Sequence, residues 1–136
     1  MVAGTQARQA STLAKARKRP ARLRKTRPAA RKRLADRLWS ALVKRAGACV
    51  LCGSRSRLQA AHGFSRRYYG TRWLPINGFC LCSGCHVRYT YDPLGWDAIL
   101  REQWGEPVYE ELRGRAQAVT RPDVEAAIAA LEAERA

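Results

Sequence analysis

Acidic residues are scarce in this sequence, and none of them occurs before Asp36. The chain carries 11 Asp and Glu against 26 Lys and Arg, which gives a formal net charge of +15 at pH 7. A charge this one-sided favours a polyanionic partner, and nucleic acid is the first candidate. The alternative is a basic surface that is simply solvated.

The sequence also lacks long apolar runs. No stretch approaches the roughly eighteen residues that a transmembrane helix needs, and the basic first thirty residues hold no signal-sequence core. We therefore expect a soluble protein with no membrane partner, located in the cytoplasm. In such a reducing compartment, paired cysteines are more typical of metal binding than of disulfides.

Large apolar groups are rare in residues 1–30, where Lys and Arg occur in dense runs. Such a segment cannot offset an ordering cost of roughly 1–2 kcal/mol per residue, so we expect a disordered basic arm. The arm could neutralise phosphates without reading sequence, or it could be a targeting address. The candidate phosphate contacts in it are Lys18, Arg19, Arg24 and Lys25.

Four of the five cysteines form two C-x-x-C pairs, Cys49 with Cys52 and Cys82 with Cys85. A separation of about thirty residues between such pairs is typical of a four-thiolate zinc site, which is structural because no coordination position stays open. The fifth, Cys80, fits a buried strand position or could replace Cys82 at the metal. His86 could also replace a thiolate, giving a Cys₃His site.

Periodicity and breakers predict a small α+β fold around these cysteines. An amphipathic helix should run from about Arg31 to Gly47, with Leu34, Leu38, Trp39, Leu42 and Val43 on its apolar face. Asp92 and Pro93 are an N-cap followed by proline at the first helical position. The other expected elements are strands at 57–61 and 78–82, and helices at 92–104 and 106–118. A terminal helix should run to Arg135, with Thr120 to Asp123 as a capping-box variant at its start.

Cations and aromatics crowd the loop from Ser65 to Trp73. Arginine can grip phosphate bidentately and aromatics can stack on unpaired bases, so this loop is a candidate nucleic-acid contact. Its candidate phosphate ligands are Arg66, Arg67 and Arg72. Trp73 and one tyrosine could instead belong to the core.

The order of these motifs resembles the HNH nucleases of the ββα-metal class. A zinc knuckle is followed by a strand ending in His62, then Asn77 before a second strand, then C-x-x-C with His86 at a helix start. The segment Leu58–Tyr68 (LQAAHGFSRRY), followed by Thr71–Trp73 (TRW) and Asn77, is similar in sequence to the phage-encoded branch that includes the NinG/Rap recombination nucleases. The similarity covers about Cys49 to Trp104.

This resemblance implies a zinc-bound, treble-clef-like ββα-metal domain and a DNA endonuclease. His62 would be the general base that takes a proton from the attacking water, which suits an imidazole. Asn77 would brace the loop carrying His62. His86 would bind one Mg²⁺ or Mn²⁺ that stabilises the leaving 3′ oxygen, leaving a 5′ phosphate and a 3′ hydroxyl.

The chain departs from the family pattern at Ala61, where many HNH enzymes place a second metal ligand. Asp92 is the best replacement from elsewhere in the chain, although it could be a plain N-cap. Asp97 is a weaker option. The missing ligand could also mean a nuclease that has lost catalysis and is kept for binding.

These observations give a basic arm at 1–30, an HNH domain with flanking helices at 31–118 and a terminal helix at 119–136. The leading hypothesis is a phage-encoded, metal-dependent endonuclease that acts on duplex or branched DNA in recombination or genome processing. The alternative is a non-catalytic, zinc-dependent nucleic-acid-binding protein. A basic component of a nucleoprotein particle would explain the charge but not the ordered histidines. The terminal helix could pack on the core or form a homodimer.

Overall fold

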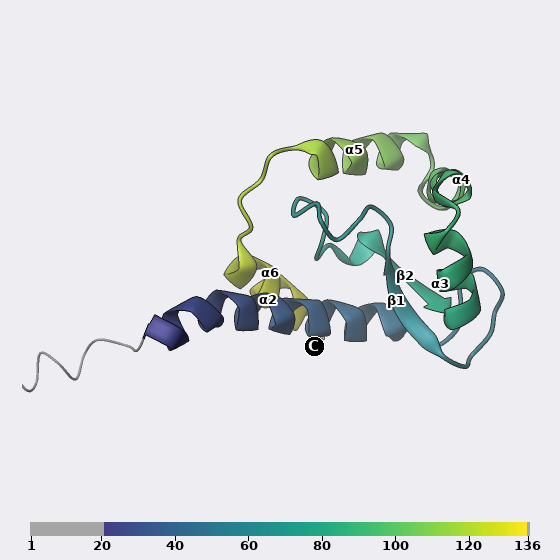
Figure 1. The fold of residues 1–136 in the computed structure, drawn as a ribbon. Coiled ribbons are helices and arrows are strands. Elements are labelled where there is room, and N and C mark those ends of the chain that lie inside the picture. The colour runs from purple at the N-terminus through teal and green to yellow at the C-terminus, as the bar shows by residue number, and fades with distance from the viewer. Residues whose placement is uncertain (1–20, 136) are drawn as a thin grey trace, which may run out of the picture. The chain divides into compact units, whose positions relative to one another are not determined.

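The structure, a computed structural model, describes residues 21–135, with side chains from residue 27 onwards. The chain divides between Lys32 and Arg33, and the account below concerns the unit that begins at Arg33. The described part holds five α-helices, a short 3-10 helix and a two-stranded sheet, in the order α2, β1, η1, β2, α3, α4, α5, α6 (Figure 1). The predicted small α+β class is confirmed.

Helix α2 spans Ala21–Lys44 and ends where expected, just before Gly47 with its φ of +74°. It begins at Ala21 and not near Arg31, so the prediction of disorder is wrong for residues 21–30. Ala, Leu, Arg and Lys are strong helix formers, and this propensity prevails over the charge density and over Pro28 within the helix. The rest of the predicted arm, residues 1–20, lies outside the described residues.

The sheet is a single hairpin of strands β1 (Leu58–His62) and β2 (Gly78–Cys82), close to the predicted strands. The two strands pair antiparallel in a register that places Leu58 opposite Cys82 and His62 opposite Gly78. The hairpin therefore separates two candidate sites, with a clustered cysteine at one end and His62 at the other. The 3-10 helix η1 (Pro75–Asn77) leads directly into β2.

Helix α3 (Ser83–Thr90) begins within the second C-x-x-C pair and carries His86. Helix α4 (Pro93–Trp104) starts as predicted, because the Asp92 side chain accepts a hydrogen bond from the Gly95 N–H and Pro93 occupies the first turn. Helix α5 follows as Glu106–Gln117, one residue shorter than expected. Figure 1 shows these three helices in succession after β2.

Helix α6 (Val124–Arg135) begins later than predicted, because the cap is Asp123 and not Thr120. The Asp123 carboxylate accepts a hydrogen bond from the Ala126 N–H at 3.1 Å. The apolar face of α6 packs on the core through Ile128 and Leu131, which belong to the cluster of Ala35, Trp39 and Trp73. Of the two alternatives for the terminal helix, packing on the core is therefore observed.

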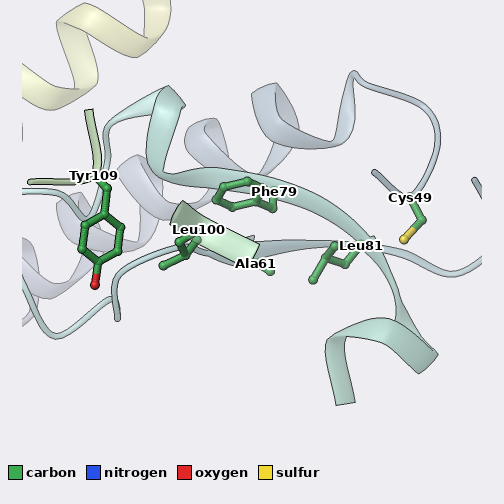
Figure 2. Close-up of a cluster of buried hydrophobic side chains, with 6 residues drawn as sticks. All are labelled: Cys49, Ala61, Phe79, Leu81, Leu100 and Tyr109. Carbon is green, nitrogen blue, oxygen red and sulfur yellow. The ribbon is translucent and has the colours of Figure 1, made fainter. Parts of the chain in front are cut away.

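A second buried cluster lies on the other face of the hairpin and joins it to α4 and α5. Figure 2 shows its side chains spread along the strands, with Tyr109 at one end and Cys49 at the other. Leu81 and Leu100 are its most buried members, at 1% and 2% exposure. The sheet is thus sandwiched between two cores, which is what makes so short a hairpin rigid. No helix in the described part is long and apolar enough to cross a membrane.

Candidate metal centre and histidine cleft

The four paired cysteines meet at the Cys82 end of the hairpin. Their Sγ atoms, from Cys49, Cys52, Cys82 and Cys85, all lie within 4.8 Å of one another. The Sγ atoms of Cys52 and Cys82 are 3.6 Å apart. A tetrahedral zinc with Zn–S bonds of about 2.3 Å has sulfur atoms about 3.8 Å apart, so the cluster could hold a metal ion such as zinc.

The first pair is shaped by a tight turn that glycine closes. Gly53 has φ +77°, and its N–H donates to the Cys49 carbonyl at 2.9 Å while the Cys49 N–H donates to Ser54 at 2.8 Å. This turn is tied to the sheet by the Val50 N–H, which donates to the Cys80 carbonyl at 2.9 Å. The knuckle and the hairpin are therefore one rigid piece.

The thiols differ in their readiness to ionise. Burial alone would raise the pKa of Cys49, but backbone N–H groups of Cys82, Cys52 and Leu51 bring it down to about 6. Burial and the thiol of Cys82 raise the pKa of Cys85 to about 12. One thiolate is thus favoured at Cys49 and a second charge is disfavoured at Cys85, and a bound cation would favour ionised thiols at such a cluster.

Neither alternative ligand joins this cluster. Cys80 is buried within β2 at 2% exposure, as expected for a small apolar residue. The Nδ1 atom of His86 lies 2.6 Å from the side-chain oxygen of Gln59, and His86 does not belong to the cysteine group. Within the part of the chain that is described, the only group of three or more potential metal ligands is the four cysteines.

His62 ends β1 and is held by two neighbours that come from other segments. Its Nε2 atom lies 3.1 Å from the backbone oxygen of Arg72. A carbonyl can only accept, so Nε2 carries the proton and Nδ1 keeps a free lone pair. The imidazole also stacks on the indole of Trp39, with ring centroids 3.9 Å apart and planes inclined by 12°.

Burial lowers the pKa of His62 to about 4, against the effect of the Arg72 carbonyl, which raises it. The positive charges of Arg66 and Arg72 lower it further, and Asp36 opposes them. The imidazole is therefore neutral at pH 7 and able to accept a proton. A pKa this low makes a weak base, which nearby negative charge would strengthen.

Asn77 is fully buried and bonded on both sides of its amide. The Phe64 N–H donates to Oδ1 at 2.8 Å, and Nδ2 donates to the Phe64 carbonyl at 3.1 Å. The backbone oxygen of Asn77 accepts from the Gly63 N–H at 2.8 Å. These are the bonds that a brace on the loop after His62 requires, while the role of Asn77 in catalysis stays a prediction.

A cleft of about 400 Å³ opens beside the end of β1. His62 and His86 both line it, from β1 and α3 respectively, so the fold brings the two histidines to one space. If Nδ1 of His86 donates to Gln59, its Nε2 is free to bind a metal, an arrangement usual for metal-ligating histidines. The other lining residues are Ala61, Gly63, Ser65, Leu81, Tyr89, Thr90, Pro93 and Trp96.

The expected second ligand is not among the residues that line this cleft. Asp92 is absent from its lining and caps α4 instead, which is the alternative that the sequence left open. Asp97 bonds to the Tyr109 hydroxyl and to Arg101. Ala61 lines the cleft with a methyl group. Among the described lining residues there is no carboxylate, so of the metal ligands expected from the sequence only His86 lines the cleft.

The three arginines predicted to contact phosphate lie differently. Arg66 and Arg67 are exposed beside the cleft residue Ser65. Arg72 is only 8% exposed, and its guanidinium donates to both oxygens of Asp36, at 3.1 and 2.7 Å. The prediction for Arg72 is therefore withdrawn, because its charge is already paired inside the fold. Lys18 and Arg19 lie outside the described residues, as do the side chains of Arg24 and Lys25.

Two residues near His62 were not singled out from the sequence for this site. Trp39 was assigned to the apolar face of its helix, yet it also stacks on the imidazole. Asp36 received no role, although it is the only acidic residue among the first 91 and its isolation among so many cations is a signal.

Comparison of the chain with models of known protein families found no match, and neither did comparison with curated proteins or with solved structures.

Proposed function

We propose that this protein is a metal-dependent DNA endonuclease of the HNH kind. The observation that carries the proposal is the cleft that His62 and His86 line together, although 24 positions separate them in the chain numbering. Asn77 adds weight, because its amide holds the residue two positions after His62 by two hydrogen bonds. A base, a brace and a metal ligand then stand in the order that the motif requires.

His62 acts as the general base. Its Nδ1 lone pair takes a proton from water while the water oxygen attacks phosphorus and the bond from phosphorus to the 3′ oxygen breaks. The leaving oxygen takes up a proton, which gives a 5′ phosphate and a 3′ hydroxyl. The phosphate near the imidazole raises its basicity as substrate binds, which offsets the low pKa of His62 in the free protein.

His86 would be the protein ligand of one Mg²⁺ or Mn²⁺, with substrate phosphate oxygens and water completing the coordination. When bound, such an ion stabilises negative charge on the leaving oxygen. The four cysteines would hold a structural Zn²⁺, which contributes on the order of 10 kcal/mol to folding in small zinc domains. The two metals thus have separate sites and separate purposes.

Nucleic acid is the partner that the charge supports. Residues 1–91 contain a single acidic residue, and the other ten of the 11 lie from Asp92 onwards. The β-hairpin, the cleft loop and the N-terminal segment are therefore in the basic part of the sequence. Arg66 and Arg67 are exposed cations that follow the cleft residue Ser65 in the chain, where they would position the DNA backbone.

A nucleic-acid-binding protein without catalysis is the second candidate. The specific observation in its favour is that the described lining of the cleft offers no carboxylate and has a methyl group at Ala61. One neutral imidazole is a weak anchor for a hard ion before substrate arrives.

The experiment that separates the two candidates measures cutting and binding together. Purified protein with its zinc content determined is incubated with supercoiled plasmid and with a synthetic four-way junction, in Mg²⁺, in Mn²⁺ and in a chelator chosen to leave the zinc bound. The wild type should cut in a divalent metal, whereas His62→Ala and His86→Ala should bind equally and not cut. Tight binding by the wild type with no cleavage in any metal would replace the nuclease with the binding protein.

A further inference from the structure

The carboxylate of Asp36 is the centre of a polar cluster between α2 and the loop that precedes η1. It accepts three hydrogen bonds, from Nε of Arg72 at 3.1 Å, from Nη2 of Arg72 at 2.7 Å and from Nε1 of Trp73 at 2.8 Å. The exposed Arg66 adds an ion pair at 3.6 Å. Three donors on one carboxylate fix the backbone at positions 72 and 73 against the helix.

The same backbone orients His62. The carbonyl that accepts from Nε2 of His62 belongs to Arg72, whose side chain is locked on Asp36. One turn further along α2, Trp39 donates its Nε1–H to the Leu74 carbonyl at 2.9 Å and stacks on the imidazole. Helix α2 therefore holds three consecutive loop residues and one face of the histidine ring.

An imidazole has two neutral tautomers, and the hydrogen bond that one nitrogen makes decides which is populated. Here the acceptor is a backbone oxygen whose position depends on the Asp36 and Arg72 pair. If that pair opens, the carbonyl can move away from Nε2 and water can reach the ring. The tautomer with a free Nδ1 then loses its preference.

We propose that Asp36 is a positioning residue for His62, acting through Arg72 to hold the imidazole in the Nε2–H tautomer with Nδ1 free to accept a proton. This inference rests on the proposed nuclease function for its catalytic meaning. Its structural half, the control of the tautomer, can be tested without any activity. It also accounts for why the only acidic residue of the first 91 is partly buried against a cation instead of lying fully in solvent.

The charged groups around His62 allow this role to be distinguished from a simple charge effect. They are Asp36 from α2 and Arg66 and Arg72 from the loop, with His86 lining the same cleft. Asp36 raises the pKa of His62 through its charge, so removing the charge alone would lower that pKa. Breaking the ion pair between Asp36 and Arg72 instead admits water to the imidazole. The effect of burial on His62 is then reversed, so the pKa of His62 would rise.

The test uses long-range ¹H–¹⁵N NMR spectra of the zinc-loaded, full-length protein. The sequence has only two histidines, so His62→Ala assigns both imidazoles at once. In the wild type, His62 should be the Nε2–H tautomer and should remain neutral down to about pH 4. If the wild-type spectra show the Nδ1–H tautomer of His62, the proposal is overturned before any variant of Asp36 or Arg72 is made.

Asp36→Asn is the decisive variant, with Arg72→Lys as a milder second one in case the first fails to fold. We expect both tautomers of His62 and a pKa at least one unit higher, toward its ordinary value near 6.5. Asp97→Asn is the matched control. Asp97 also pairs with an arginine and an aromatic side chain, but it lies on α4 and bonds to neither Arg72 nor His62. It should leave the His62 signals unchanged.

Activity gives an independent arm. Asp36→Asn should lower kcat by at least about tenfold with DNA affinity nearly unchanged, as expected for a mispositioned base. If His62 keeps its tautomer and its pKa falls in Asp36→Asn, Asp36 acts only as a charge and the proposal is overturned. If the NMR changes occur but the wild type cleaves nothing, the positioning stands and the nuclease function fails.

Discussion

Asn77 offers the sharpest test of how the fold builds the histidine site. In Asn77→Ala, the N–H and the carbonyl of Phe64 both lose their buried partner. An unsatisfied buried polar group costs about 1–3 kcal/mol, so the free energy of unfolding should fall by about 2–6 kcal/mol. Domains of this size have about 5–15 kcal/mol in total, which makes the loss easy to measure.

The assay is urea unfolding of zinc-loaded protein, followed by tryptophan fluorescence at constant zinc content. Gln59→Ala is the matched control, since it removes a hydrogen bond to His86 at the exposed end of the Gln59 side chain. That variant should stay within about 0.5 kcal/mol of the wild type. A loss below about 1 kcal/mol in Asn77→Ala would refute the reasoning, because the brace would then contribute little to the fold.

Asn77→Asp separates hydrogen bonding from shape. The carboxylate is nearly isosteric with the amide and still accepts from the Phe64 N–H, but it faces the Phe64 carbonyl without a donor. Burial and this repulsion raise the folded-state pKa above the unfolded value of about 3.9. Stability should then fall as pH rises, by up to about 1.4 kcal/mol per pH unit between the unfolded value of about 3.9 and the folded pKa. Wild-type stability with no dependence on pH from about pH 4 to pH 8 would contradict the assigned bonds.

Three further predictions concern the metal centre, the hairpin and the DNA contact. Serine at any of the four clustered cysteines should lower the zinc content, whereas Cys80→Ser should retain it; equal zinc in all variants would disprove the cluster. Gly78→Ala would place a Cβ atom 2.1 Å from Val43 Cγ2, so urea unfolding should show a loss of about 1–3 kcal/mol that Val43→Ala partly restores. Strict additivity of the two changes would exclude that clash. Arg66→Ala and Arg67→Ala should each reduce the salt dependence of DNA binding by about one phosphate contact, and unchanged slopes would remove them from the interface.

Local signals in the sequence predicted much of this fold. The strand positions, the spacing of the cysteines and the start of α4 at Asp92 and Pro93 each depend on neighbouring residues, and the structure agrees with them. The same kind of signal misled at Thr120, because Asp123 competes for the cap three residues later. A predicted helix start is wrong where two nearby side chains can each cap the same helix.

The candidate site was harder to predict from the sequence than the fold, because its contacts join segments that are distant along the chain. Arg66 and Arg72 look alike in one loop, yet Arg66 is exposed and only ion-paired to Asp36 at 3.6 Å, whereas Arg72 is buried and donates two hydrogen bonds to that carboxylate, 36 positions earlier. Nothing near Arg72 in the sequence reveals that partner. The stacking of Trp39 on His62 is equally non-local, since it depends on how α2 packs against the hairpin.

The central claim is that His62 is the base of a nuclease, and the most direct measurement is the single-turnover rate of plasmid cleavage. Wild type and His62→Ala are compared at saturating protein, equal zinc content and the same divalent metal. The account predicts a rate lower by about 10²–10⁴-fold in His62→Ala, with DNA affinity unchanged. Equal rates for the two proteins would contradict it, because the chemistry would then not pass through this imidazole.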